Sequence, residues 1–201
     1  MLTLSQGENA INSLIQEMSM SKTRNEAQTR FHLIDELLVR CLGWDKEIVD
    51  VEIYENEGFT DYELGKPRQA VLEAKREGTT FAIPAGMSSK LLVDIKSLMK
   101  ISEEASKAFI QVQSYCSMRG VPVAIISNGH QYISFLASRQ DGINVFDGDA
   151  IVFKSLEHMR ENFSVAWQLL SAPGIKEKHI YSYLHSGERG VPNKLSSKLI
   201  N

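Results

Sequence analysis

The spacing of the apolar residues changes from about 3.6 residues to two near Ile48, and this change most restricts the folds open to the chain. Before it, apolar residues recur at helical spacing over 10–18 and 25–42. After it, the runs 48–54, 59–64 and 69–75 are typical of strands, with turns at 55–58 and 65–67. Two helices followed by a three-stranded meander must pack as helices against a sheet.

The second half of the sequence adds further helices and strands. Ser102 is a good N-cap for a helix that ends near Arg119, and residues 155–170 have the spacing of another helix. Asn128-Gly129 separates the apolar runs 121–127 and 131–136, which predicts a hairpin with a type I′ turn, whose two central residues need positive φ. A last strand is expected at 150–153, whereas residues 76–101 give only a short extended piece at 79–83. The expected fold is therefore α/β, a mixed β-sheet with a β-meander core, flanked by helices.

Size and charge limit the classes of function. The chain has 201 residues and a formal net charge of −3, which excludes the strongly basic surface of an autonomous nucleic-acid clamp but allows a local basic groove. Cys41 and Cys116 are isolated and are expected to be buried thiols, not zinc ligands. The N-terminus does not resemble a signal peptide, and no apolar run reaches the roughly 18 residues of a membrane span, so a cytoplasmic location is expected.

Domain organisation is expected to be simple. Residues 1–170 hold all the strongly patterned segments and should form one domain. Residues 171–201 contain Pro-Gly and Gly-Val-Pro breaks and are expected to be a weakly packed tail or a linker toward an absent domain.

Acidic residues on two neighbouring predicted strands suggest chemistry. Asp61 lies near the middle of one strand, and Glu73-Ala74-Lys75 ends the next. Because adjacent antiparallel strands lie about 4.8 Å apart, the two carboxylates can converge on one ion, and the carbonyl of Ala74 can join them. These hard oxygen ligands suit Mg²⁺, for which Mn²⁺ can substitute. An isolated Glu-x-Lys is more often a pair of surface charges, so the argument depends on the accompanying residues.

Five short segments, in order and at similar spacing, resemble the PD-(D/E)XK nuclease superfamily. They are NEAQTRFHLIDELLVRCLGWD, DYEL, VLEAKREG, QVQSY and VAIISNGHQY. The closer similarity is to the N-terminal nuclease domain of the motor (R) subunit of type I restriction enzymes and to related bacterial anti-phage defence proteins, over roughly residues 20–170. Thr60 stands where the superfamily name has proline, a position that varies among its members.

The resemblance implies a restriction-endonuclease-like fold and a role for each matching residue. Asp61 and Glu73, with the Ala74 carbonyl, would be metal ligands, Lys75 the catalytic lysine and Glu26 an accessory carboxylate. Gln111 and Tyr115, one helical turn apart, would complete the site. The alternatives are structural: Glu26 can simply favour its helix N-terminus, Gln111 can be an exposed side chain, and Tyr115 can pack at the edge of the core.

Together these observations predict a Mg²⁺-dependent endonuclease domain that hydrolyses DNA, the effector of a restriction or anti-phage defence system. Duplex DNA would bind without sequence readout through Lys66, Arg68, Arg76 and Lys90. The family joins such domains to an ATP-driven translocase or a signalling NTPase, and a dimer or higher oligomer would bring two sites to the two strands. Two alternatives remain: a nuclease-like binding or assembly module without hydrolysis, and a nuclease that acts on RNA.

Overall fold

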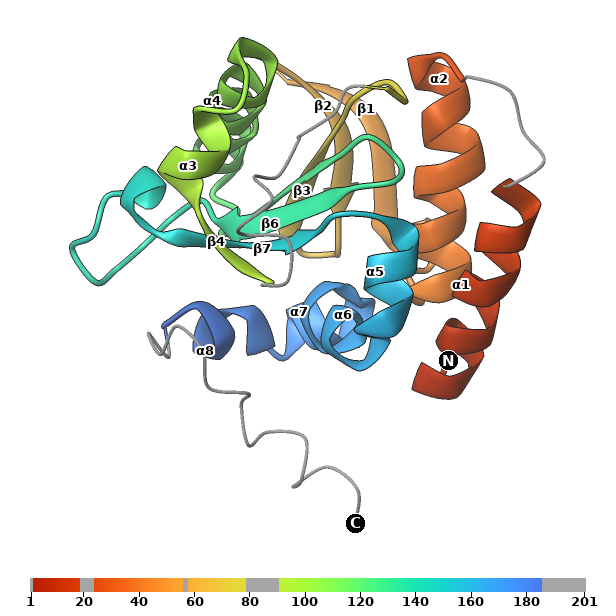
Figure 1. Ribbon diagram of the computed structural model, residues 1–201. Coiled ribbons are helices and arrows are strands. Elements are labelled where there is room, and N and C mark those ends of the chain that lie inside the picture. Colours follow the sequence, from red (N-terminus) through yellow and green to blue (C-terminus); the bar gives the residue numbers. More distant parts are fainter. Residues whose placement is uncertain (1, 19–23, 56–57, 79–90, 186–201) are drawn as a thin grey trace.

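The computed structural model describes all residues except 1, 19–23, 56–57, 79–90 and 186–201 (Figure 1). Its centre is a seven-stranded sheet in the order β1-β2-β3-β5-β6-β7-β4. The strands are β1 (Val49–Glu55), β2 (Gly58–Leu64), β3 (Ala70–Ala74), β4 (Leu92–Asp94), β5 (Val123–Ser127), β6 (Tyr132–Leu136) and β7 (Asp149–Phe153). Strands β3 and β5 pair in parallel and all the other neighbours are antiparallel, so the expected mixed sheet with a β1–β2–β3 meander is confirmed.

Helices cover both faces of this sheet (Figure 1). They are α1 (Leu4–Met18), α2 (Glu26–Thr29), α3 (Ile95–Met99), α4 (Glu103–Arg119), α5 (Leu156–Glu161), α6 (Phe163–Leu170), α7 (Ala172–Lys176) and α8 (His179–His185). One core lies between the sheet and α3 and α4, through Val71, Phe109 and Ile126. A larger core on the other face joins α1, the helix that follows Asn25 and α5–α8.

The helix after Asn25 departs from the expected regular stripe. It begins as α2 and continues through two π-helical segments, η1 (Arg30–Ile34) and η2 (Leu37–Cys41). Because π-turns advance more residues per turn, the buried face shifts, and Phe31, which regular α-helical spacing would place on the apolar stripe with Ile34 and Leu38, is 66% exposed. The face that packs on the sheet contains Leu33, Ile34, Leu37, Leu38 and Cys41.

The prediction of a weakly packed tail is wrong for residues 172–185. Ser171 caps α7 by accepting a hydrogen bond from the amide of Gly174, and Pro173 occupies the first turn, where proline needs no N–H donor. The side chains of Ile175, Ile180 and Leu184 are buried in the larger core. The end of the patterned region at 170 is therefore not the end of the packed chain, and residues 186–201 lie outside the described residues.

The predicted β5–β6 hairpin is confirmed, but the prediction of a type I′ turn is wrong. Gly129 has φ +84°, whereas Asn128 does not have the positive φ that this turn type requires. The loop has four residues, and the Asn128 side chain accepts hydrogen bonds from the amides of His130 (3.1 Å) and Gln131 (2.8 Å). The asparagine therefore stabilises the loop through its side chain.

Two further differences concern segments of weak or broken pattern. Within 91–101 the structure forms β4, which pairs with β7 at one edge of the sheet, and α3, capped by Asp94. The helix expected at 155–170 is divided at Asn162 into α5 and α6. The predicted extended piece at 79–83 lies outside the described residues. Among the residues placed here, no helix is long and apolar enough to cross a membrane.

Candidate active site

Asp61 and Glu73 lie beside each other on β2 and β3. The paired register runs from Leu64↔Ala70 to Tyr62↔Leu72, and one further step places Asp61 opposite Glu73. Both side chains are largely removed from solvent, with residue exposures of 8% and 3%. The convergence expected from the sequence is thus present in the fold.

The backbone at the end of β3 takes part in this arrangement. The carboxylate Oδ2 of Asp61 accepts a hydrogen bond of 2.8 Å from the amide of Ala74, while the amide of Lys75 donates to the carbonyl of Ser127 on β5. Because the N–H and C=O of one residue in a strand point toward the same neighbour, the carbonyl of Ala74 faces the Asp61 side. The Ala74 oxygen therefore points toward β2, the strand that carries Asp61, as expected for the third metal ligand predicted from the sequence.

The electrostatic environment of Glu73 is unusual for a glutamate. The pKa of Glu73 is raised to about 7, chiefly by burial, and the negative charges of Asp61 and, to a smaller extent, Glu26 contribute to this rise. The hydrogen bond from Lys75 acts in the opposite direction without cancelling these effects. The charged form of Glu73 is therefore disfavoured here, because burial and the neighbouring Asp61 outweigh the bond from Lys75.

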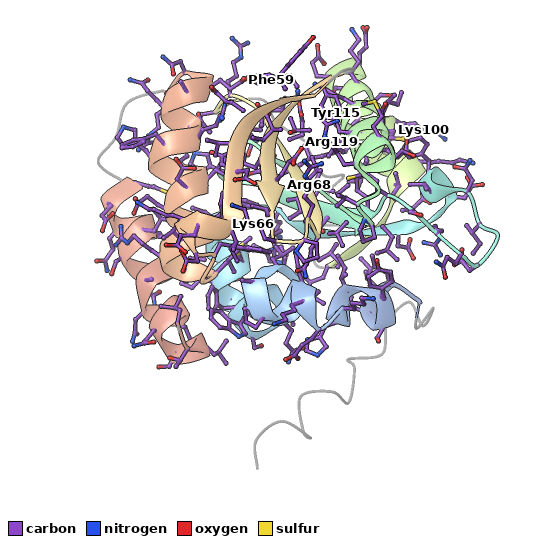
Figure 2. The ribbon with its side chains drawn as sticks, turned by 180° about the vertical axis from the view of Figure 1, so that it is seen from behind. Phe59, Lys66, Arg68, Lys100, Tyr115 and Arg119 are labelled. Carbon is purple, nitrogen blue, oxygen red and sulfur yellow. The ribbon has the colours of Figure 1, made fainter. Side chains whose placement is uncertain are left out.

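A hydrogen-bonded chain connects Glu73 to α4. The ammonium Nζ of Lys75 donates to Glu73 Oε1 (2.6 Å) and to Gln111 Oε1 (3.2 Å), and Gln111 Nε2 donates to the hydroxyl of Tyr115 (3.1 Å). Gly58 of β2 lies against the Tyr115 ring, so closely that a Cβ there would lie 2.7 Å from Cε1. Figure 2 shows Tyr115 on the side of α4 that faces the β1–β2 strands. The four residues predicted from two distant segments are therefore joined.

Glu26 is held near the site by contacts that the sequence did not suggest. It is the first residue of α2, whose N-terminus is capped by Asn25 and Gln28 in a capping box. Beyond Lys75, the carboxylate of Glu77 accepts a hydrogen bond from the amide of Arg24 (2.9 Å) and lies 2.7 Å from His130 Nε2 on the β5–β6 loop. Glu77 therefore joins the start of α2 to the end of β3, where Glu73 lies.

Two further residues contact the site and were not predicted. The guanidinium of Arg30, one turn after Glu26, lies 3.5 Å from Asp61 Oδ1 and 3.0 Å from Glu52 Oε1 on β1. The spacing Glu26-x-x-x-Arg30 is the only sequence signal for this contact, because it places both side chains on one helical face. Glu52 gives no such signal, since its contact depends on how β1 meets the helix.

The residues expected to contact nucleic acid are not gathered at the site. Lys66 and Arg68 lie in the β2–β3 turn, at the end of these strands away from Lys75, and pair with Asp50 and Glu63 (Figure 2). Arg76 directly follows Lys75 and is exposed. Lys90 lies outside the described residues. Among the candidates that the structure describes, only Arg76 therefore supports a basic groove beside the carboxylates.

The donor set fits a hard divalent cation. It offers two buried, adjacent carboxylates and a neighbouring carbonyl, the oxygen donors that Mg²⁺ and Mn²⁺ accept together with water. Within the described part of the chain, no group of three or more His, Cys, Asp or Glu side chains is close enough to hold a metal by itself. The carbonyl of Ala74 and water would therefore have to complete the coordination.

Comparison with known proteins adds no relative. No family model matches the chain, and neither the curated proteins nor the solved structures contain a match. Fold and site alone therefore define the class of the protein. It is an α/β chain with a mixed seven-stranded sheet, in which two buried carboxylates on β2 and β3 lie beside a lysine that follows β3 and a glutamine of α4.

Proposed function

We propose that the chain is a restriction-endonuclease-like, Mg²⁺-dependent nuclease domain of the PD-(D/E)XK superfamily that hydrolyses DNA phosphodiester bonds. The observation that carries the proposal is the convergence of Asp61, Glu73 and Lys75 at one end of two adjacent strands, with Lys75 bonded to both Glu73 and Gln111. Structural ion pairs are seldom built with two buried carboxylates side by side, because each raises the cost of ionising the other.

Each residue of the site has a definable task in this proposal. Asp61, Glu73 and the Ala74 carbonyl would hold the ion, which when bound lowers the pKa of a coordinated water and neutralises charge on a phosphate oxygen. Lys75 is placed to orient the attacking water and to offset the negative charge that develops on the phosphate. Gln111 holds the ammonium of Lys75, and Tyr115 holds Gln111.

The proposal extends to partners through the sequence resemblance alone. A net charge of −3 and the scarcity of described basic residues at the site favour weak, salt-dependent binding of DNA without sequence readout. Targeting by an ATP-driven translocase or a signalling NTPase, as in type I restriction enzymes and related defence systems, would supply what this domain lacks. A cytoplasmic location fits such a role.

The test is cleavage of supercoiled plasmid, linear duplex, single-stranded DNA and RNA with Mg²⁺, Mn²⁺ or EDTA. We expect metal-dependent cleavage of DNA by the wild type and none by Asp61→Asn or Glu73→Gln. Glu104→Gln, which changes an exposed carboxylate on α4, is the matched control and should cleave like the wild type. Cleavage of RNA in preference to DNA would change the substrate, and cleavage that survives both substitutions would contradict the proposed site.

A further inference from the structure

Arg30 is a half-buried cation at the edge of the candidate active site. It is the first residue of η1, and its side chain is only 14% exposed. Its Nη1 lies 3.0 Å from Glu52 Oε1 and 3.5 Å from Asp61 Oδ1, and its guanidinium lies over the Tyr62 ring, 5.2 Å from the centroid. Two ion pairs and a cation–π contact thus fix this guanidinium beside one of the proposed metal ligands.

The edge strand is shaped to make this contact. In the register of β1 against β2, Glu52 falls opposite Asp61, and it has φ +55°, a conformation that non-glycine residues seldom adopt. Backbone strain of this kind persists where surrounding contacts require it. Here the carboxylate of Glu52 reaches Arg30 although its own side chain is 60% exposed.

The two oxygens of Asp61 are both engaged in this structure. Oδ2 accepts the amide hydrogen of Ala74, and Oδ1 faces the guanidinium of Arg30. An ion that binds Asp61 through Oδ1 must therefore replace the attraction of Arg30, whereas the bond to Ala74 can remain.

We propose that Arg30 is a positioning residue that holds Asp61 Oδ1 in the metal-free chain and competes with the divalent cation for it, so that Arg30 sets the metal affinity of the site. This inference rests on the proposed function, since it concerns the ion that Asp61 and Glu73 would hold. Glu52 tempers the competition because it offers the guanidinium a second carboxylate at shorter distance.

The test measures Mn²⁺ binding by calorimetry, together with thermal unfolding. Arg30→Met removes the competing charge and should bind Mn²⁺ about tenfold more tightly than the wild type, as expected for loss of a like charge a few ångströms from the ion. Arg30→Lys keeps the charge and should return the affinity toward that of the wild type. The matched control is Arg40→Met, because Arg40 lies in η2 of the same helix and pairs with Glu17 and Glu36 at the surface.

The outcomes separate this inference from the proposed function. If folded wild type binds no Mn²⁺, both are overturned. If wild type binds Mn²⁺ and folded Arg30→Met binds it equally or more weakly, Arg30 only fastens the helix to the sheet and this inference alone is overturned.

A second variant covers the case in which Arg30→Met does not fold. Glu52→Gln leaves Arg30 with Asp61 as its remaining carboxylate contact in the described structure, so Mn²⁺ affinity should fall several-fold. Glu47→Gln, which changes an exposed carboxylate just before β1, should leave the affinity unchanged. Equal affinity in Glu52→Gln and Glu47→Gln would overturn the competition.

Discussion

Two buried glutamates on adjacent strands, Glu63 and Glu73, face the same side of the sheet but are neutralised differently. Glu63 is 1% exposed, and its two oxygens meet two guanidinium groups, Arg119 Nε at 2.9 Å and Arg68 Nε at 2.5 Å. Glu73 is 3% exposed and has the ammonium of Lys75, but the carboxylate of Asp61 lies alongside. Figure 2 shows Arg68 and Arg119 near each other, as their shared contact with Glu63 requires.

The difference separates a structural from a functional use of buried charge. A buried carboxylate is tolerated when cations and hydrogen bonds compensate it, as around Glu63, where Thr60 also donates a bond of 2.9 Å. At Glu73 the compensation is incomplete, and the pKa is raised as a result. An added cation would therefore stabilise the arrangement around Glu73, whereas Glu63 already has the cations that it needs.

The largest effect is expected from Lys75→Ala. Loss of the ammonium should lower the DNA cleavage rate at least about a hundredfold, the usual scale for a group that stabilises charge developing in the transition state. Far-ultraviolet circular dichroism should show an intact fold, because Lys75 lies at the open end of β3. Lys107→Ala, a substitution on the exposed side of α4, is the matched control. Undiminished cleavage by Lys75→Ala would place this lysine outside the chemistry.

Arg119→Met should have the opposite pattern, a large loss of stability. Its guanidinium is 4% exposed, so its removal leaves Glu63 partly uncompensated, at a cost of about 3 kcal/mol. Chemical denaturation at neutral pH measures this loss. A substitution without effect on the free energy of unfolding would show that Arg68 alone suffices, and the contrast between the two glutamates would weaken.

Glu73→Gln should stabilise the metal-free chain, and only at higher pH. Because the folded-state pKa of about 7 lies above the unfolded value near 4.5, the folded state binds the proton more tightly, and stability falls as pH rises between these values. The neutral glutamine avoids this loss, so at pH 8 the variant should be more stable by about 3 kcal/mol, and near pH 4 the difference should vanish. Unfolding in EDTA at both pH values checks the sign, and a variant less stable at pH 8 would contradict it.

The smallest effect is expected from Asn128, whose side chain stabilises the β5–β6 loop itself. Asn128→Ala removes an acceptor for two loop amides and should cost about 1 kcal/mol of stability, without a change in the cleavage rate per folded molecule. Denaturation and cleavage at matched concentrations test this. A large loss of cleavage in the folded variant would give the loop a role in the reaction.

The sequence predicted the parts of the site that depend on strand order and helix spacing. Asp61 and Glu73 follow from adjacent strands with period two, and Gln111 with Tyr115 from one helical turn. Arg30 and Glu52 were missed because their contacts join segments 22 and 31 residues apart in sequence through π-helical turns and a strained strand. Nothing local in the sequence encodes such geometry.

The same reasoning explains the errors in the fold. Pro173 and Gly174 look like a break, yet a proline in the first turn after a serine cap begins a helix as well as it ends one. Burial of Ile175, Ile180 and Leu184 then depends on a surface that the sheet and the earlier helices provide. The meander and the mixed sheet were predictable because alternation is a local pattern, whereas packing of short helices is decided by tertiary contacts.

Calorimetric titration of Mn²⁺ into wild type, Glu73→Gln and Glu104→Gln at pH 8 tests the central claim most directly, namely that the Asp61–Glu73 end of the sheet is built to take a divalent cation. The account predicts binding by wild type and by Glu104→Gln, and loss of binding in Glu73→Gln with its fold intact. Equal binding by all three, or none by folded wild type, would contradict it.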